Sequence, residues 1–181
     1  MRDKIAEGDL LYHPVHGLCR MNRIIKQNRS GKDVRCYSLV PKIISKMKER
    51  FIIAVTGIET SGFHRLISLK EANDILAYLK TGKSTAAPAR VAPKAGSSFF
   101  EQNQTWSLAQ AVLTFSRDEF APKDQRKRQM LERSVKGLVG ELAFVFKMTL
   151  KETVTKLLKS LENTSKINPS VRVAFVNAGE D

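Results

Sequence analysis

The chain has 181 residues, 42% of them hydrophobic, and a formal net charge of +13, a composition that supports folded cores and excludes a wholly disordered chain. No apolar run approaches the roughly 18 residues of a membrane-spanning helix, and charges stand where a secretory signal would be apolar, so we expect a cytoplasmic protein without a membrane partner. The positive charge makes nucleic acid the leading partner class; an anionic membrane surface, or no polyanionic partner, is the alternative.

Residues 1–82 show the pattern of a small β-module. Short runs rich in branched and aromatic residues are separated by turn-forming residues, and this spacing predicts four or five strands in a small, strongly bent antiparallel sheet or barrel. The runs are residues 10–12, 17–25, 34–40 and 50–55. A capping box at Ser68 and Glu71 then predicts a helix that ends at Gly82 and closes the module.

The remainder of the chain separates into a linker, a helical domain and an extension. Residues 83–98 are rich in Ala, Pro, Ser and Gly, which predicts a semi-extended linker. Residues 99–163 show helical periodicity, with helices starting near Thr105, around Pro122, and at a second capping box that begins at Thr149.

Residues 164–181 contain an alternating stretch, Val171 to Phe175, with which both an added strand and a loose tail are compatible. The pattern as a whole predicts an α+β protein of two domains: a Tudor-like antiparallel β-barrel or sheet, followed by a compact α-helical domain.

The sequence offers little material for catalysis. The three histidines and two cysteines match no zinc or redox spacing, and the common hydrolase, nucleotide-binding and metalloprotease motifs are missing, so we expect no enzyme activity, no metal and no cofactor. Glu141 is the one carboxylate flanked by small and apolar residues. A lone carboxylate is not a catalytic pair, and we expect it to serve helix packing or a salt bridge.

Residues 8–17, Gly-Asp-Leu-Leu-Tyr-His-Pro-Val-His-Gly, resemble the opening of the CarD/CdnL family of bacterial transcription factors, which transcription-repair coupling factor shares in its polymerase-interacting domain. Further stretches resemble the family's helical part: residues 128–131, 138–143 and 148–152. The resemblance covers about residues 5–82 and 104–162.

This resemblance implies a function. In the family, the N-terminal barrel binds the β-subunit lobe of RNA polymerase, and the helical domain meets the upstream edge of the transcription bubble, where a Trp wedges into the minor groove. The protein would then stabilise open promoter complexes through DNA contacts that do not read sequence.

The positions that would carry these contacts depart from the family's pattern. At the polymerase surface the family often has arginines, where this chain has Gln27, Asn28 and Ile52, with Arg29 and Arg50 adjacent. The helix that bears the family's Trp is replaced by the linker. Trp106 is therefore interpreted as a core residue or as the wedge, and Phe99 or Phe100 are the substitutes.

Basic residues around the start of the long helix predict phosphate contacts, although a solvated helix face is the alternative reading. With Trp106, the expected DNA-binding residues are Lys123, Arg126, Lys127, Arg128, Arg133 and Lys136. The function we expect is that of a transcription regulator bound to RNA polymerase and promoter DNA. The alternative is a non-catalytic adaptor with a Tudor-like module whose partner is not RNA polymerase.

Overall fold

A computed structural model describes residues 5–42, 49–83, 104–117, 124–162 and 167–180. The chain divides into two compact units, Met1–Leu66 and Ile67–Asp181. The first is a sheet and the second is helical, so the predicted α+β arrangement is confirmed. The predicted linker beyond Lys83, the two candidate wedge residues Phe99 and Phe100, and Lys123 lie outside the described residues.

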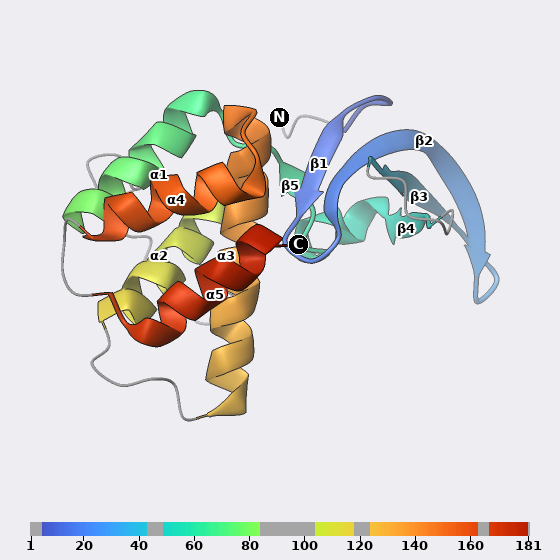
Figure 1. Ribbon diagram of the computed structural model, residues 1–181. Coiled ribbons are helices and arrows are strands. Elements are labelled where there is room, and N and C mark those ends of the chain that lie inside the picture. The colour runs from blue at the N-terminus through green and yellow to red at the C-terminus, as the bar shows by residue number, and fades with distance from the viewer. Residues whose placement is uncertain (1–4, 43–48, 84–103, 118–123, 163–166, 181) are drawn as a thin grey trace. The chain divides into compact units, whose positions relative to one another are not determined.

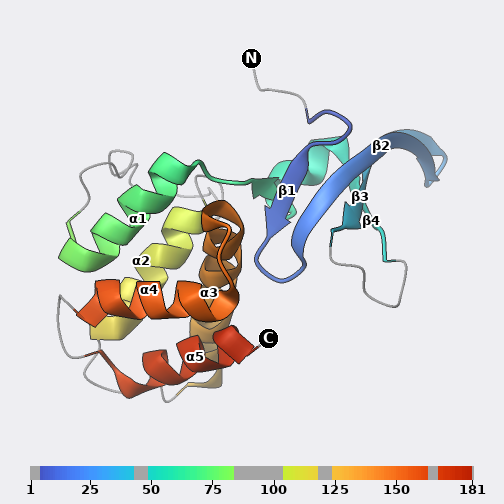
Figure 2. The same cartoon turned by 45° about the horizontal axis from the view of Figure 1, so that its top comes forward.

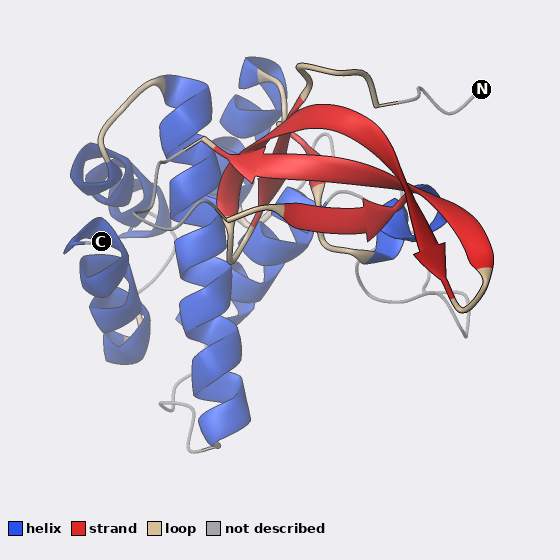
Figure 3. Cartoon of the chain, turned by 90° about the vertical axis from the view of Figure 1, so that its right-hand side faces the viewer, coloured by secondary structure: helices blue, strands red, loops and turns tan. Residues whose placement is uncertain are grey.

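The N-terminal unit is a five-stranded antiparallel sheet in the order β4-β3-β2-β1-β5 (Figures 1 and 3). Its strands are β1 (Leu10–His13), β2 (Gly17–Arg29), β3 (Lys32–Pro41), β4 (Phe51–Ala54) and β5 (His64–Arg65), with a 3-10 helix, η1 (Val55–Thr60), between the last two. The predicted strands are all present, and their core contains Leu11, Cys19, Met21, Tyr37, Leu39 and Phe63.

A two-residue turn joins the two longest strands, β2 and β3. Ser30 and Gly31 both have positive φ, of 52° and 77°, which is the conformation of a type I′ turn and matches the right-handed twist of the strands. The pairing runs from Cys19 opposite Pro41 to Arg29 opposite Lys32, with a bulge next to Met21. Bulges increase local bending and twist, and the two strands curve strongly in Figure 1.

The described part of the C-terminal unit contains five helices, α1 (Leu69–Thr81), α2 (Gln104–Arg117), α3 (Gln125–Phe146), α4 (Leu150–Glu162) and α5 (Pro169–Glu180). Helix α3 contacts each of the other four helices, and Figure 2 shows the group from a second direction. The predicted starts of α1 and α4 are confirmed, since Ser68 and Thr149 exchange hydrogen bonds with Glu71 and Glu152 as capping boxes.

Helix α1 does not close the β-module, contrary to the prediction. Its buried residues, Ala72, Ile75 and Leu79, belong to the core of the helical unit. The capping box and Gly82 correctly gave the helix its ends, but local signals of this kind carry no information about which neighbour an apolar stripe packs against. The boundary between the units therefore lies after Leu66, before the helix.

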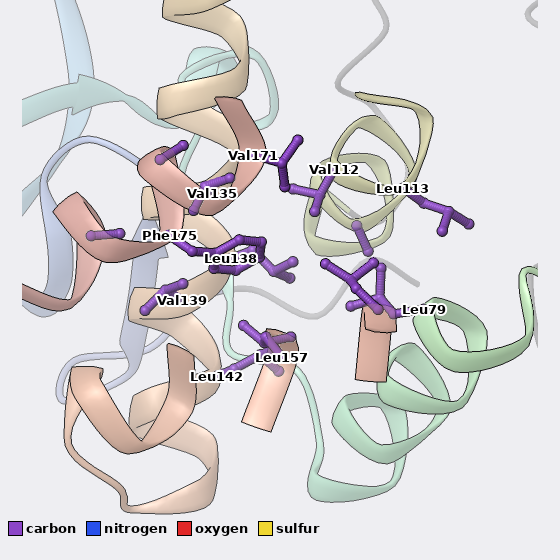
Figure 4. Close-up of a cluster of buried hydrophobic side chains, with 14 of the residues drawn as sticks. Leu79, Val112, Leu113, Val135, Leu138, Val139, Leu142, Leu157, Val171 and Phe175 are labelled. Carbon is purple, nitrogen blue, oxygen red and sulfur yellow. The ribbon is translucent and has the colours of Figure 1, made fainter. Parts of the chain in front are cut away.

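The C-terminal residues form neither of the two predicted structures, an added strand or a loose tail. Helix α5 buries Val171, Ala174, Phe175 and Ala178, whose spacing of three, one and three residues is that of one helix face. Val171, Arg172 and Val173 alternate apolar and polar side chains, as in a strand. This short alternation hid the helical period of the longer segment. Phe175 is fully buried beside Leu138 and Val139 of α3, as Figure 4 shows, so these residues are part of the helical domain.

A buried carboxylate joins three segments of the helical unit. Glu141 of α3 has 0% of its surface exposed, and its oxygens accept hydrogen bonds from the backbone N–H of Ile67, at 3.3 Å, and from the hydroxyl of Thr105, at 2.7 Å. Ile67 stands just before α1 and Thr105 is in the first turn of α2. Glu141 thus serves helix packing, which was one of the two roles predicted for it.

We expect Glu141→Ala to lower the free energy of unfolding by about 2–4 kcal/mol, because it leaves two buried donors without their acceptor and creates a cavity. Glu141→Gln keeps the volume and one acceptor oxygen and should cost about half as much. Denaturant unfolding measures both. Glu132→Gln, at an exposed position of the same helix, is the control, and an equal effect of all three changes would contradict this role.

Candidate functional site

The first two turns of α3 are exposed up to Met130. Every residue from Asp124 to Met130 is solvent-accessible, and Figures 1 and 3 show this end of α3 reaching past the ends of α2 and α5. The carboxylate of Asp124 caps the helix by accepting a hydrogen bond from the backbone N–H of Arg126, at 2.9 Å. The helix begins at Gln125, and Pro122, where its first turn was predicted, lies outside the described residues.

After the N-cap Asp124, the charges in the first turn of this helix are opposite to the usual preference. The N-terminus of a helix carries a partial positive charge, which favours acidic side chains nearby, but the first turn of α3 contains no acidic residue and holds Arg126, Lys127 and Arg128. Three cations at the positive end of a helix repel it and one another, and an anion placed there would relieve this repulsion.

Two further predicted residues continue the cationic surface along α3. Arg133 is two turns from Arg126 and Lys136 is nearly one turn further, and all three are exposed. The opposite side of the helix carries the buried residues Leu131, Val135, Leu138 and Leu142. Helical spacing thus brings Arg126, Arg133 and Lys136 to one side of α3, whereas Lys127 and Arg128, one and two residues after Arg126, point to other sides of the helix.

Arg128 also lines a groove of about 340 Å³ between α3 and α5. Its other lining residues mix apolar and polar side chains, among them Glu132, Val173 and Asn177. An acidic residue on its wall makes this groove less suitable for an anion than the outer stripe of α3.

Trp106 occupies the position of a core residue. Its ring is half-buried, packs against the helical core, and lies 5.6 Å from the ring of Tyr78 in α1, measured between centroids. Insertion between DNA bases would require the ring to leave this contact. Of the two readings of Trp106, the structure therefore favours packing between α1 and α2.

The residues expected at the polymerase surface fall into two groups. Paired residues of neighbouring strands point to the same side of a sheet, and Ile52 pairs with Ser38 whereas Gln27 pairs with Val34. These positions share the face of the sheet opposite the core residues Tyr37 and Leu39, where Ser38 is itself buried, but lie four residues apart along β3, which is about 13 Å. Asn28 points to the other face, and Arg50 directly precedes β4.

Exposed cations near the β2–β3 turn were not among the predicted site residues. Arg23, Lys26, Lys32 and Arg35 are all exposed, and Lys26 stands directly opposite Arg35. In the sequence, a Lys or Arg recurs at every third residue from position 23 to position 35. This regular spacing was the signal that could have revealed them. Without the hairpin register it reads only as scattered positive charge.

Several residues of the opening motif, which carries the family resemblance, stabilise the local backbone. Gly8 and Gly17 have positive φ, of 93° and 68°, which side chains disfavour. The carboxylate of Asp9 accepts a hydrogen bond from the N–H of Ala6 and forms an ion pair with Arg65 at 3.2 Å. The ring nitrogen Nδ1 of His13 accepts hydrogen bonds from two backbone amides of the β1–β2 turn.

His13 is also packed within the sheet unit. Its ring lies 4.5 Å from that of His16 and 4.8 Å from that of Phe63, between centroids. Its Nε2 would be only 2.6 Å from a Cβ atom at Gly62, so that position requires glycine. Burial, together with the neighbouring His16, lowers the pKa of His13 to about 4, which keeps Nδ1 free to accept hydrogen bonds.

We expect the stability of the protein to fall in mild acid because of His13. In the unfolded chain its pKa is near 6.5, above the folded value of about 4, so the unfolded state binds a proton more readily and the free energy of unfolding falls as the pH drops from about 7 towards 4. In His13→Asn the side-chain oxygen can accept the same two amides without titrating. Its unfolding should therefore depend less on pH than that of His16→Asn, and equal slopes would count against the idea.

Within the described part of the chain, no helix combines the length and apolar character required to cross a membrane, and no group of three or more His, Cys, Asp or Glu residues is arranged to hold a metal ion. Comparisons with models of known protein families and with curated proteins found no match to this chain.

Proposed function

We propose that this protein is a bacterial transcription regulator of the CarD/CdnL type, which binds the RNA polymerase β subunit through its sheet unit and promoter DNA through α3. The observation that carries the proposal is the exposed cationic start of α3, with Arg126, Lys127 and Arg128 in a turn that contains no acid. Such a surface suits phosphate oxygens, which it would contact without reading bases.

The DNA contact would act by neutralising backbone charge. Arg126 and Arg133 lie seven residues apart on one helix, which is about 10 Å along its axis, so the stripe can follow several successive phosphates of one strand. Binding that follows the backbone rather than the bases holds an open promoter complex in place on any sequence, which is the role the family resemblance implies.

The polymerase contact is supported by the outer face of the sheet. Ile25, Val34 and Ile52 are half-buried branched residues on this face, and Arg50, directly before β4, is an exposed cation. A partly apolar strand surface with a charged rim resembles the anatomy of protein interfaces. We place the dock at β4 and the adjoining part of β3, around Ile52.

The second candidate function is that of a non-catalytic adaptor whose partner is not RNA polymerase. The position of Trp106 favours it. A ring packed against Tyr78 does not supply the DNA wedge of the family, and a protein that only joins partners would not need one. The two candidates differ in whether the sheet unit binds polymerase.

For the DNA contact, we expect the triple change Arg126→Gln, Lys127→Gln, Arg128→Gln to weaken binding equally on unrelated duplex sequences. The slope of log affinity against log salt should flatten by about 0.9 for each phosphate that the variant no longer neutralises. Fluorescence anisotropy over a salt series measures both. The matched control is Lys70→Gln, Lys80→Gln, Lys151→Gln, at exposed positions of α1 and α4; a weakening that depends on DNA sequence, or one equal to the control's, would refute phosphate contact by α3.

For the polymerase contact, we expect the full-length chain to bind the isolated β-subunit lobe, and Ile52→Asp to weaken this binding at least about tenfold, as removal of a central apolar side chain does at interfaces. Calorimetry or a pull-down gives the affinity. Val176→Asp, at an exposed position of α5, is the control. Absence of binding by the unaltered chain would reject polymerase docking and leave the adaptor reading.

A further inference from the structure

The distal part of the β2–β3 hairpin, residues 23–35, forms a two-stranded ribbon. Strand β1 pairs with β2 only from Gly17 to Arg20, and β4 pairs with β3 only from Cys36 to Leu39, whereas β2 and β3 stay paired out to Arg29 and Lys32. In the described part of the chain, both edges of this ribbon are therefore without a strand partner. Figures 1 and 3 show it extending beyond β1 and β4.

The ribbon carries positive charge of unusual density. Residues 23–35 contain five Lys and Arg residues and one acid, Asp33. Lys26 stands directly opposite Arg35, and Arg29 opposite Lys32. Like charges in facing positions destabilise an antiparallel pair, and Lys26 and Arg35 form such a pair. An anion bound beside the ribbon would offset this repulsion.

The charges cover both faces of the ribbon. Lys26 and Arg35 point to one face, while Arg23 and Lys32, which stand an odd number of residues from them, point to the other. All four side chains are exposed. The cationic surface thus surrounds the ribbon over about 20 Å, the length of six extended residues.

Protection of an open sheet edge explains only part of this pattern. Charged side chains at an edge discourage pairing with another strand, and mixed Lys and Glu would serve that purpose while attracting each other across the ribbon. The near absence of acids and the facing cations Lys26 and Arg35 are not needed to protect the edge. They are expected of a surface that binds a continuous polyanion.

We infer that the β2–β3 ribbon binds the phosphate backbone of duplex DNA. Duplex DNA presents one negative charge per about 1.7 Å, which matches an extended surface of one sign better than a local acidic patch on a protein does. The major groove of B-form DNA also admits a two-stranded ribbon, whereas that of A-form RNA is too narrow. The proposed function places DNA on α3 and polymerase around β4, so this assigns a second DNA contact, in the sheet unit.

The test uses the full chain and a mixed-sequence DNA duplex of about 30 base pairs, with anisotropy measured over a salt series. The four-fold variant carries Arg23→Gln, Lys26→Gln, Lys32→Gln and Arg35→Gln. It should bind at least about tenfold more weakly at low salt, and its salt slope should fall by up to about 3.6, which is 0.9 for each of four phosphates. Asp33→Asn removes the only acid of the ribbon and should bind more tightly.

The matched control neutralises four exposed lysines of the helical unit, Lys70, Lys80, Lys147 and Lys151, and should retain most of the affinity. Both ribbon variants keep α3 intact, so failure of α3 to bind DNA and failure of the ribbon to do so give separate results. The inference is overturned if the four-fold variant keeps the salt slope of the unaltered chain. It is equally overturned if DNA binding survives while binding to the polymerase lobe disappears. Should the four-fold variant fold poorly, the direction of change in Asp33→Asn decides.

Discussion

A carboxylate without access to water sets the arrangement of the helical unit. The cost of burying Glu141 is recovered only when donors meet its oxygens, and the two donors come from Ile67, just before α1, and Thr105, at the start of α2. Both helices must therefore begin beside the C-terminal part of α3. This requirement is independent of hydrophobic packing, which alone would tolerate several rotations and shifts of one helix against another.

The cationic end of α3 lies beyond the part of this helix that joins the core. The buried residues of this 22-residue helix begin at Leu131 and end at Ala143, and the positions before Leu131 have no core to join. The first turns are therefore exposed because α3 is longer than the core against which it packs. The hairpin of the sheet unit follows the same principle, because β2 and β3 continue to pair beyond the strands that flank them. Each unit thus extends a regular element past its core, and each extension is cationic.

Much of the fold could be predicted from local chemistry. The strands, the turn at Ser30 and Gly31, and both capping boxes are encoded within a few residues, and all are present. What could not be predicted depends on partners distant in sequence. The stripe of α1 packs on the helical core instead of the sheet, and the period of α5 is visible only when Ala178 is counted with Val171 and Phe175.

The candidate site shows the same division. Helical spacing was enough to group Arg126, Arg133 and Lys136 on one side of α3. The polymerase-facing set was taken from a family pattern, and the register of β3 separates Gln27 from Ile52. The facing cations of the hairpin appear only once that register is known.

The place of α1 has a consequence for how this protein can be divided. A fragment that ended after Gly82, where the helix stops, would carry the apolar side chains of Ile75 and Leu79 without the helices that cover them, and would remove the N–H of Ile67 from Glu141. The remaining helices would in turn expose the surface that α1 covers. Gene fusion or shuffling that respects the cores must cut between Leu66 and Ile67, so the exchangeable piece of this chain is the sheet alone, and α1 is inherited with the helices.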